Sequence, residues 1–164
     1  MTGLRWISVD PSCRCSGVAV WQGDALMGTH AIKPSLDSPE WPRLIADTMP
    51  RMLVYEAAAQ GGKGYQTAVM LERHRGDIRR WCALGGCPEE VAVGVQEWRT
   101  VLGVKGPGRD VKGSTARTGA WKAAAREAVR LRVMAGELTV EALQGGSDEI
   151  DAVCIGLAWL RMTQ

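Results

Sequence analysis

Carboxylate side chains gather at three places in the sequence, and their spacing could serve a divalent metal ion. Near the C-terminus the segment GGSDEIDAV places Asp148, Glu149 and Asp151 directly before an apolar run. Two further acids, Asp10 and Glu56, each end a short apolar segment. A carboxylate that ends a buried strand is costly to desolvate unless it is paired or bound to a metal. Hard oxygen ligands of this kind select Mg²⁺ or Mn²⁺.

The acids near the C-terminus open a helix whose apolar stripe identifies the face that each acid occupies. The stripe consists of Ile150, Val153, Cys154, Leu157 and Ala158, and it must face the rest of the protein. Asp148 and Asp151, three residues apart, lie on one side of this helix, and Asp151 borders the stripe. Glu149 lies on the other flank, where it complements the helix dipole, and Ser147 is predicted to cap the helix. Without partners elsewhere, the whole cluster would be only a favourable helix start.

The elements that must position these acids are predicted from apolar alternation, helical spacing and glycine breaks. Gly23 and Asp24 indicate a hairpin. A hairpin followed by alternating strands and helices favours an α/β fold with a mixed sheet. We expect strands at 4–10, 17–22, 25–33, 51–57 and 91–96, helices at 41–49, 67–84, 120–135 and from 147 onward, and a glycine-rich basic loop at 103–119.

The predicted sheet brings the acids together. Asp10 and Glu56 fall at the carboxyl ends of strands, where sites form in open α/β sheets. A single acid of this kind, such as Asp10 before Pro11, is often only a turn former. Two of them, together with Asp148 and Asp151, predict a site of four carboxylates from three elements. Two metal ions about 3.5–4 Å apart in such a site would clamp the attacking and leaving oxygens of a phosphodiester.

Charge is unevenly distributed, although the formal net charge is only +2. Residues 103–132 contain eight Lys or Arg against two acids, whereas residues 133–164 contain five acids against one Arg. A basic segment beside an acidic cluster suits a polyanionic partner with a metal site nearby. The alternative is a basic face that only contacts solvent.

Composition narrows the class of protein. A length of 164 residues with 46% hydrophobic and 23% charged residues is typical of one soluble globular domain. No apolar run reaches membrane-spanning length and no signal-peptide pattern opens the chain, so no membrane partner is expected. The five cysteines include no CxxC pair. This pattern predicts reduced thiols and no structural zinc. Reduced thiols indicate a cytoplasmic location, which would be the bacterial cytoplasm or, for a phage protein, that of the host.

Four segments in order resemble the RuvC family of Holliday junction resolvases, which has the RNase H-like fold of the retroviral integrase superfamily. They are ISVDPSCRCSGVAV at 7–20, VYEAAAQGGKGYQTAVMLERHRG at 54–76, TGAWKAAAREAV at 118–129 and SDEIDAVCIGLA at 147–158. Each segment is weak evidence alone, but four in family order across nearly the whole chain form a specific signal. The short chain and divergent loops favour a phage or other viral branch.

The resemblance implies one RNase H-like nuclease domain over residues 1–164, with a mixed five-stranded sheet flanked by helices. It implies an Mg²⁺-dependent endonuclease, with Mn²⁺ able to substitute and two ions per active site, that resolves four-way DNA junctions as a homodimer by paired symmetric nicks. The catalytic and metal-binding residues by position are Asp10, Glu56, Asp148 and Asp151. The expected DNA-binding residues are Lys63, Tyr65, Lys105, Arg109, Lys112, Arg117 and Lys122.

The sequence also departs from the family pattern. Ser12 replaces the glycine that usually follows Asp-Pro, and Ala59 occupies a position where the family commonly has an aromatic residue that stacks at the opened junction. Tyr65 on the same loop is the candidate substitute for that aromatic residue.

Other functions share parts of this pattern. A related RNase H-like nuclease acting on branched DNA or RNA-containing duplexes would use the same acids. An actin-type ATPase needs two such domains and roughly twice this length, since one domain of this size is a single core. A non-catalytic junction-binding module would not need four carboxylates.

Overall fold

The computed structural model describes residues 3–33, 39–57, 65–108 and 111–164. Within them the chain forms a five-stranded sheet in the spatial order β3-β2-β1-β4-β5. Strands β1, β2 and β3 pair antiparallel, whereas β4 pairs parallel with both β1 and β5. The predicted mixed sheet is therefore confirmed. The strands are β1 (Arg5–Asp10), β2 (Ser16–Gln22), β3 (Ala25–Ile32), β4 (Met52–Glu56) and β5 (Glu89–Val93).

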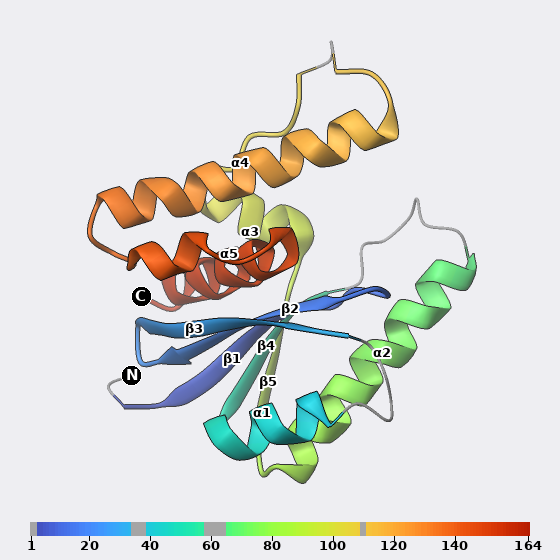
Figure 1. The fold of residues 1–164 in the computed structure, drawn as a ribbon, viewed down its shortest axis with the longest axis vertical. Helices are drawn as coiled ribbons and strands as arrows, with labels where there is room; N and C mark the ends of the chain where they lie inside the picture. The colour runs from blue at the N-terminus through green and yellow to red at the C-terminus, as the bar shows by residue number, and fades with distance from the viewer. Residues whose placement is uncertain (1–2, 34–38, 58–64, 109–110) are drawn as a thin grey trace.

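Helices cover both faces of the sheet (Figure 1). Helices α1 (Glu40–Thr48) and α2 (Tyr65–Leu84) lie on one face. The other face carries α3 (Val95–Val101), α4 (Ser114–Met134), the 3₁₀ helix η1 (Val140–Leu143) and α5 (Ser147–Met162). None of the helices in the described part of the chain is long and apolar enough to cross a membrane.

Alternation in β1 gives each face of the sheet its own core. Trp6 belongs to the cluster formed with α3, α4 and α5, whereas Ile7 and Val9 belong to the cluster formed with α1 and α2. Trp6 stacks on Trp21 of β2, with ring centroids 5.0 Å apart. Because β1 is central and buried on both sides, the position of its last residue, Asp10, is fixed by the whole sheet.

Helix α5 is the most deeply buried helix, and a series of buried hydrogen bonds fixes its register against the sheet. The buried indole Nε1 of Trp21 donates to Ser8 Oγ at 2.8 Å, and Ser8 Oγ donates to the carbonyl of Ala152 at 2.7 Å. Buried polar groups that are fully paired in this way specify one arrangement of the elements around them. Ala152 follows Asp151, so this chain of hydrogen bonds also positions the acidic start of the helix.

Three features differ from the sequence-based prediction. The strand predicted at 91–96 ends at Val93, and α3 begins at Val95. The predicted loop at 103–119 is too long, since α4 begins at Ser114 after Gly113, whose φ is 87°. The N-cap of α5 is Gly146 rather than Ser147. Short helices such as α3 form mainly through tertiary packing, and the anchor of α3 is Trp98, which is buried.

Candidate active site

The four acids selected from the sequence line one pocket of about 340 Å³. Asp10 and Glu56 are the last residues of β1 and β4, which are parallel neighbours and therefore end at the same edge. Asp148 and Asp151 come from the first turns of α5. Lys122 of α4, Arg99 of α3 and Arg14 of the β1–β2 segment line the same pocket, so three cationic residues accompany the four carboxylates.

Gly17 explains how the start of α5 comes so close to Asp10. In the β1–β2 ladder Gly17 pairs with Asp10, and a Cβ added at Gly17 would overlap the backbone carbonyl of Asp148. Only a residue without a side chain lets the helix backbone approach the strand this closely. The Gly of the segment CSGVAV therefore permits the contact between α5 and the end of β1.

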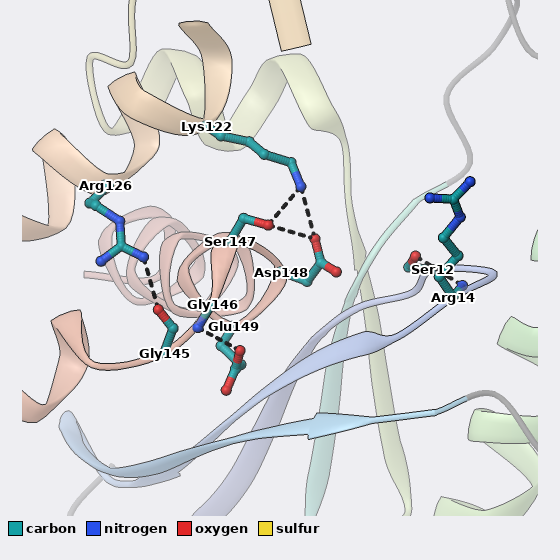
Figure 2. Close-up of polar contacts among 9 residues, drawn as sticks. All are labelled: Ser12, Arg14, Lys122, Arg126, Gly145, Gly146, Ser147, Asp148 and Glu149. Atoms are coloured by element: carbon teal, nitrogen blue, oxygen red, sulfur yellow. Dashed lines mark hydrogen bonds and ion pairs between the residues drawn. The ribbon is translucent and has the colours of Figure 1, made fainter. Parts of the chain in front are cut away.

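The start of α5 is held by basic residues from α4 (Figure 2). Lys122 Nζ donates to Ser147 Oγ at 2.6 Å and to Asp148 Oδ1 at 3.2 Å. Arg126 donates to the carbonyl of Gly145 at 2.9 Å. Glu149 turns away from Asp148, and its carboxylate accepts the Gly146 N–H at 2.7 Å. Glu149 thus serves the helix terminus, as expected, and it does not line the carboxylate pocket.

Helix α3 supplies two neighbouring residues that sequence reasoning missed. Trp98 Nε1 donates to Glu56 Oε2 at 3.1 Å, so the indole orients that carboxylate. Arg99 lies with its guanidinium carbon 4.0 Å from the ring centroid of Trp121 and 5.1 Å from that of Trp98. The only sequence signal for either residue was the pair Trp-Arg beside the basic segment, which has no periodicity of its own.

Helix α2 supports the backbone on the other side of the pocket. Arg75 Nε donates to the carbonyl of Glu56 at 3.1 Å. His74 Nε2 lies 2.8 Å from Ser16 Oγ, which also accepts the N–H of Ser12 at 3.2 Å. Burial lowers the pKa of His74, so a neutral ring suits this contact. These bonds hold the segment after Asp10 and the end of β4.

Burial and mutual repulsion raise the pKa of two of the acids. Desolvation is the largest cause for Asp10, whose pKa is raised well above its usual value, and Glu56, Asp151 and Asp148 add repulsion. The pKa of Asp151 is raised to about 7 by desolvation and then by Glu56, although Lys122 and Arg99 oppose the shift. The two cations therefore only partly offset the negative charge, which is typical of a functional site.

The donor set fits a hard divalent cation, because carboxylate oxygens from several elements line one pocket and repel one another. Two of the four acids have other partners: Asp148 is paired with Lys122 and Glu56 with Trp98. Within the described ranges, no group of three or more His, Cys, Asp or Glu side chains is arranged to hold a metal ion. Binding of Mg²⁺ or Mn²⁺ by these acids stays a prediction.

The expected DNA-binding residues are spread more widely than the acids. Lys122 lines the pocket, whereas Lys105, Lys112 and Arg117 are exposed on the segment before and at the start of α4. Tyr65 begins α2, and only its backbone is described; Lys63, Arg109 and the Ala59 position lie outside the described residues. The pocket also contains Pro11, Ser12, Cys13 and Arg14, all from the segment that joins β1 to β2.

The fold is that of solved Holliday junction resolvases. Thermus thermophilus RuvC in complex with a Holliday junction substrate has a TM-score of 0.66 and 13% identity, covering 98% of this chain and 94% of that one. The yeast mitochondrial resolvase Ydc2 has a TM-score of 0.61 and 9% identity, covering 98% and 80%. The fowlpox virus resolvase has a TM-score of 0.52 and 12% identity, covering 97% and 99%.

These similarities define the class of fold, which is the RNase H-like α/β fold with a mixed five-stranded sheet. No family model matches the sequence, and no curated protein sequence matches it. The relationship is therefore a structural one at low identity, and it shows the fold alone.

Proposed function

We propose that this protein is a metal-dependent endonuclease that cuts branched DNA, above all four-way Holliday junctions. The observation that carries the proposal is the convergence of Asp10, Glu56, Asp148 and Asp151 on one pocket beside Lys122. The fold likeness to three resolvases supports it, since one of them holds a Holliday junction substrate. Resolution of a junction needs two symmetric nicks, so the proposal includes a homodimer.

The four acids, Lys122 and the neighbouring Trp98 each have a role that follows from their position. Asp10, Glu56, Asp148 and Asp151 would hold Mg²⁺ ions, which supply water activation and stabilise the leaving oxygen when bound. Trp98 keeps the Glu56 carboxylate oriented through its 3.1 Å hydrogen bond. Lys122, 3.2 Å from Asp148, stabilises the negative charge of the acids and lies where a DNA phosphate would approach them.

Carboxylate-to-amide variants test this proposal. Asp10→Asn, Glu56→Gln, Asp148→Asn and Asp151→Asn remove charge with little change in volume, so the fold should survive. Each should reduce nicking of a four-way junction by about 10²–10³-fold or more, in line with the loss of one preorganised catalytic group. Junction binding should persist or tighten, because a negative charge facing phosphate has been removed.

The assay compares four-way, three-way, flap, linear duplex and RNA-containing duplex DNA at matched Mg²⁺, with binding measured beside nicking. Glu149→Gln is the control, because Glu149 carries similar charge on the same helix but bonds Gly146 instead; it should keep most activity. Symmetric nicks confined to the four-way substrate support a resolvase, whereas equal cutting of the other substrates supports a broader branched-DNA or RNA-directed nuclease. Normal cutting by folded Asp148→Asn and Asp151→Asn would refute the nuclease site.

A further inference from the structure

Two cationic side chains of the pocket, Arg14 and Arg99, have no carboxylate partner in the described part of the chain, and of these Arg14 is exposed whereas Arg99 is half-buried. Arg99 lines the pocket together with all four acids, and its charge lowers the pKa of Asp151. Among the described residues, however, no acid lies within ion-pair distance of its guanidinium, and its buried Nε has no hydrogen-bond acceptor. Lys122, by contrast, is already paired with Asp148.

Two indoles hold the guanidinium in place of an acid. Trp121 of α4 and Trp98 of α3 lie at 4.0 and 5.1 Å from its central carbon, within the range of a cation–π contact. Trp121 is itself fixed, because a Cβ at Gly106 would overlap its ring. A cation–π contact uses none of the N–H donors of a guanidinium, so the indoles leave these donors available for an anion.

We infer that Arg99 binds the phosphate group that is cut, and that the two indoles keep its N–H donors away from the carboxylates until that phosphate arrives. This inference rests on the proposed nuclease function and deepens it. A guanidinium offers two parallel N–H donors to two oxygens of one phosphate, which an ammonium group cannot do. Negative charge that develops on the phosphate during cleavage strengthens these bonds, so Arg99 is a catalytic residue.

The position of Arg99 distinguishes it from residues that only bind the DNA backbone. Lys105, Lys112 and Arg117 are exposed outside the pocket, whereas Arg99 shares a pocket wall with Asp10 and Asp151. A residue that touches only the reacting phosphate affects the rate of cleavage more than the affinity for the whole junction. This difference between rate and affinity is the measurable signature of the inference.

The test compares Arg99→Gln and Arg99→Lys with Arg79→Gln, measured as single-turnover junction cleavage and junction binding at saturating Mg²⁺. Arg79 is the matched control, because it is exposed on α2 and paired with Glu90 on the far side of the sheet. We expect Arg99→Gln to lose about 10²-fold or more in cleavage rate with binding changed less than about threefold. Arg99→Lys should recover only part of the rate, since a lysine is a point charge. Arg79→Gln should match the wild type.

Several results would overturn the inference. Cleavage by folded Arg99→Gln at the wild-type rate would remove Arg99 from the chemistry while leaving the nuclease proposal intact. Equal losses of cleavage and binding would mean that Arg99 only contacts the DNA backbone, and the inference would be wrong. If Arg99→Gln does not fold, Arg99→Lys decides, and a full wild-type rate there would refute the role of the guanidinium fork. A wild type that cuts none of the DNA substrates would overturn the nuclease proposal and this inference with it.

Discussion

Asp10 and Asp151, which we propose as metal ligands, illustrate how a residue suited to a metal site can oppose folding of the metal-free protein. Both lie among other carboxylates, and burial raises their pKa. A carboxyl group whose pKa is higher in the folded state than in the unfolded chain favours folding only while it is protonated. Without a bound cation these groups therefore reduce stability at neutral pH. Sites that concentrate like charge in this way commonly exchange stability for activity.

The stability of the metal-free protein should therefore depend on Asp151 in a defined pH window. Its pKa rises from the usual 3.8 to about 7 on folding, so its contribution is favourable below about pH 4 and is lost as the pH rises through 7. Asp151→Asn should raise the free energy of unfolding at pH 8 by about 1–3 kcal/mol relative to wild type. The difference should disappear near pH 4. Urea unfolding in EDTA across this pH range measures it.

The control for this prediction is Asp24→Asn, because Asp24 is an exposed residue of the β2–β3 turn. That variant should follow the wild type at every pH. Addition of Mg²⁺ should reduce or reverse the advantage of Asp151→Asn, since a cation that binds the folded state stabilises it by mass action. An Asp151→Asn variant that is less stable than wild type at pH 8 in EDTA would mean that Asp151 makes favourable contacts that outweigh the repulsion.

At the scale of elements, the approach of α5 to β2 determines where Asp148 lies. Gly17→Ala would place a methyl group against the Asp148 carbonyl, and overpacking of this kind costs about 1–3 kcal/mol. We expect a lower melting temperature. Nicking should fall by about 10²-fold, because a displacement of about 1 Å in a catalytic group has an effect of that size.

Gly28→Ala provides the comparison, since Gly28 lies in β3 of the same sheet and a Cβ there meets no atom within 4 Å. This variant should keep both stability and activity. Thermal unfolding and junction nicking, measured together, separate the two effects of Gly17→Ala. A Gly17→Ala protein with wild-type values in both assays would show that α5 can shift without moving Asp148 from its working position.

The elements that could be predicted from sequence are those whose residues carry a regular signal. Two apolar segments with strand alternation each end in an acid, which predicts that Asp10 and Glu56 lie at the carboxyl ends of strands. Both residues do end strands, and these two strands are parallel neighbours. The apolar stripe that includes Ile150 and Val153 is buried, as its helical spacing required. The hairpin at Gly23 is confirmed as well.

Helix α3 could not be predicted for a physical reason. It has seven residues, fewer than an isolated helix needs in water, and its opening Val-Gln continues the apolar pattern of β5. Its helical form depends on the burial of Trp98. The roles of Trp98 and Arg99 therefore depend on contacts with Glu56 and Trp121, and sequence spacing does not reveal contacts between distant segments. The pairing of Lys122 with Ser147 and Asp148 was hidden in the same way.

At the scale of the whole molecule, positive charge lies beside the pocket and continues away from it. Lys105, Lys112 and Arg117 are exposed before and at the start of α4, which lies on the same face of the sheet as α5 (Figure 1). A junction arm that enters the pocket at Lys122 would extend over this segment. Each phosphate contact releases counterions, so log K for binding falls as log salt rises. Each contact should add about 0.9 to the steepness of that slope.

The triple variant Lys105→Ala, Lys112→Ala, Arg117→Ala should therefore bind junctions with a salt slope shallower by up to about 2.7. Its nicking rate at low salt and saturating protein should stay near wild type, because the pocket is intact.

The control is the triple variant Arg43→Ala, Arg79→Ala, Arg80→Ala. It removes the same charge from exposed positions on α1 and α2, which cover the opposite face of the sheet. Binding titrations from about 50 to 200 mM salt measure both slopes. If both triple variants show the same decrease in salt slope, the decrease comes from overall charge. If the Lys105, Lys112 and Arg117 variant keeps the wild-type slope, the basic segment only contacts solvent, and DNA must approach the acids from another side.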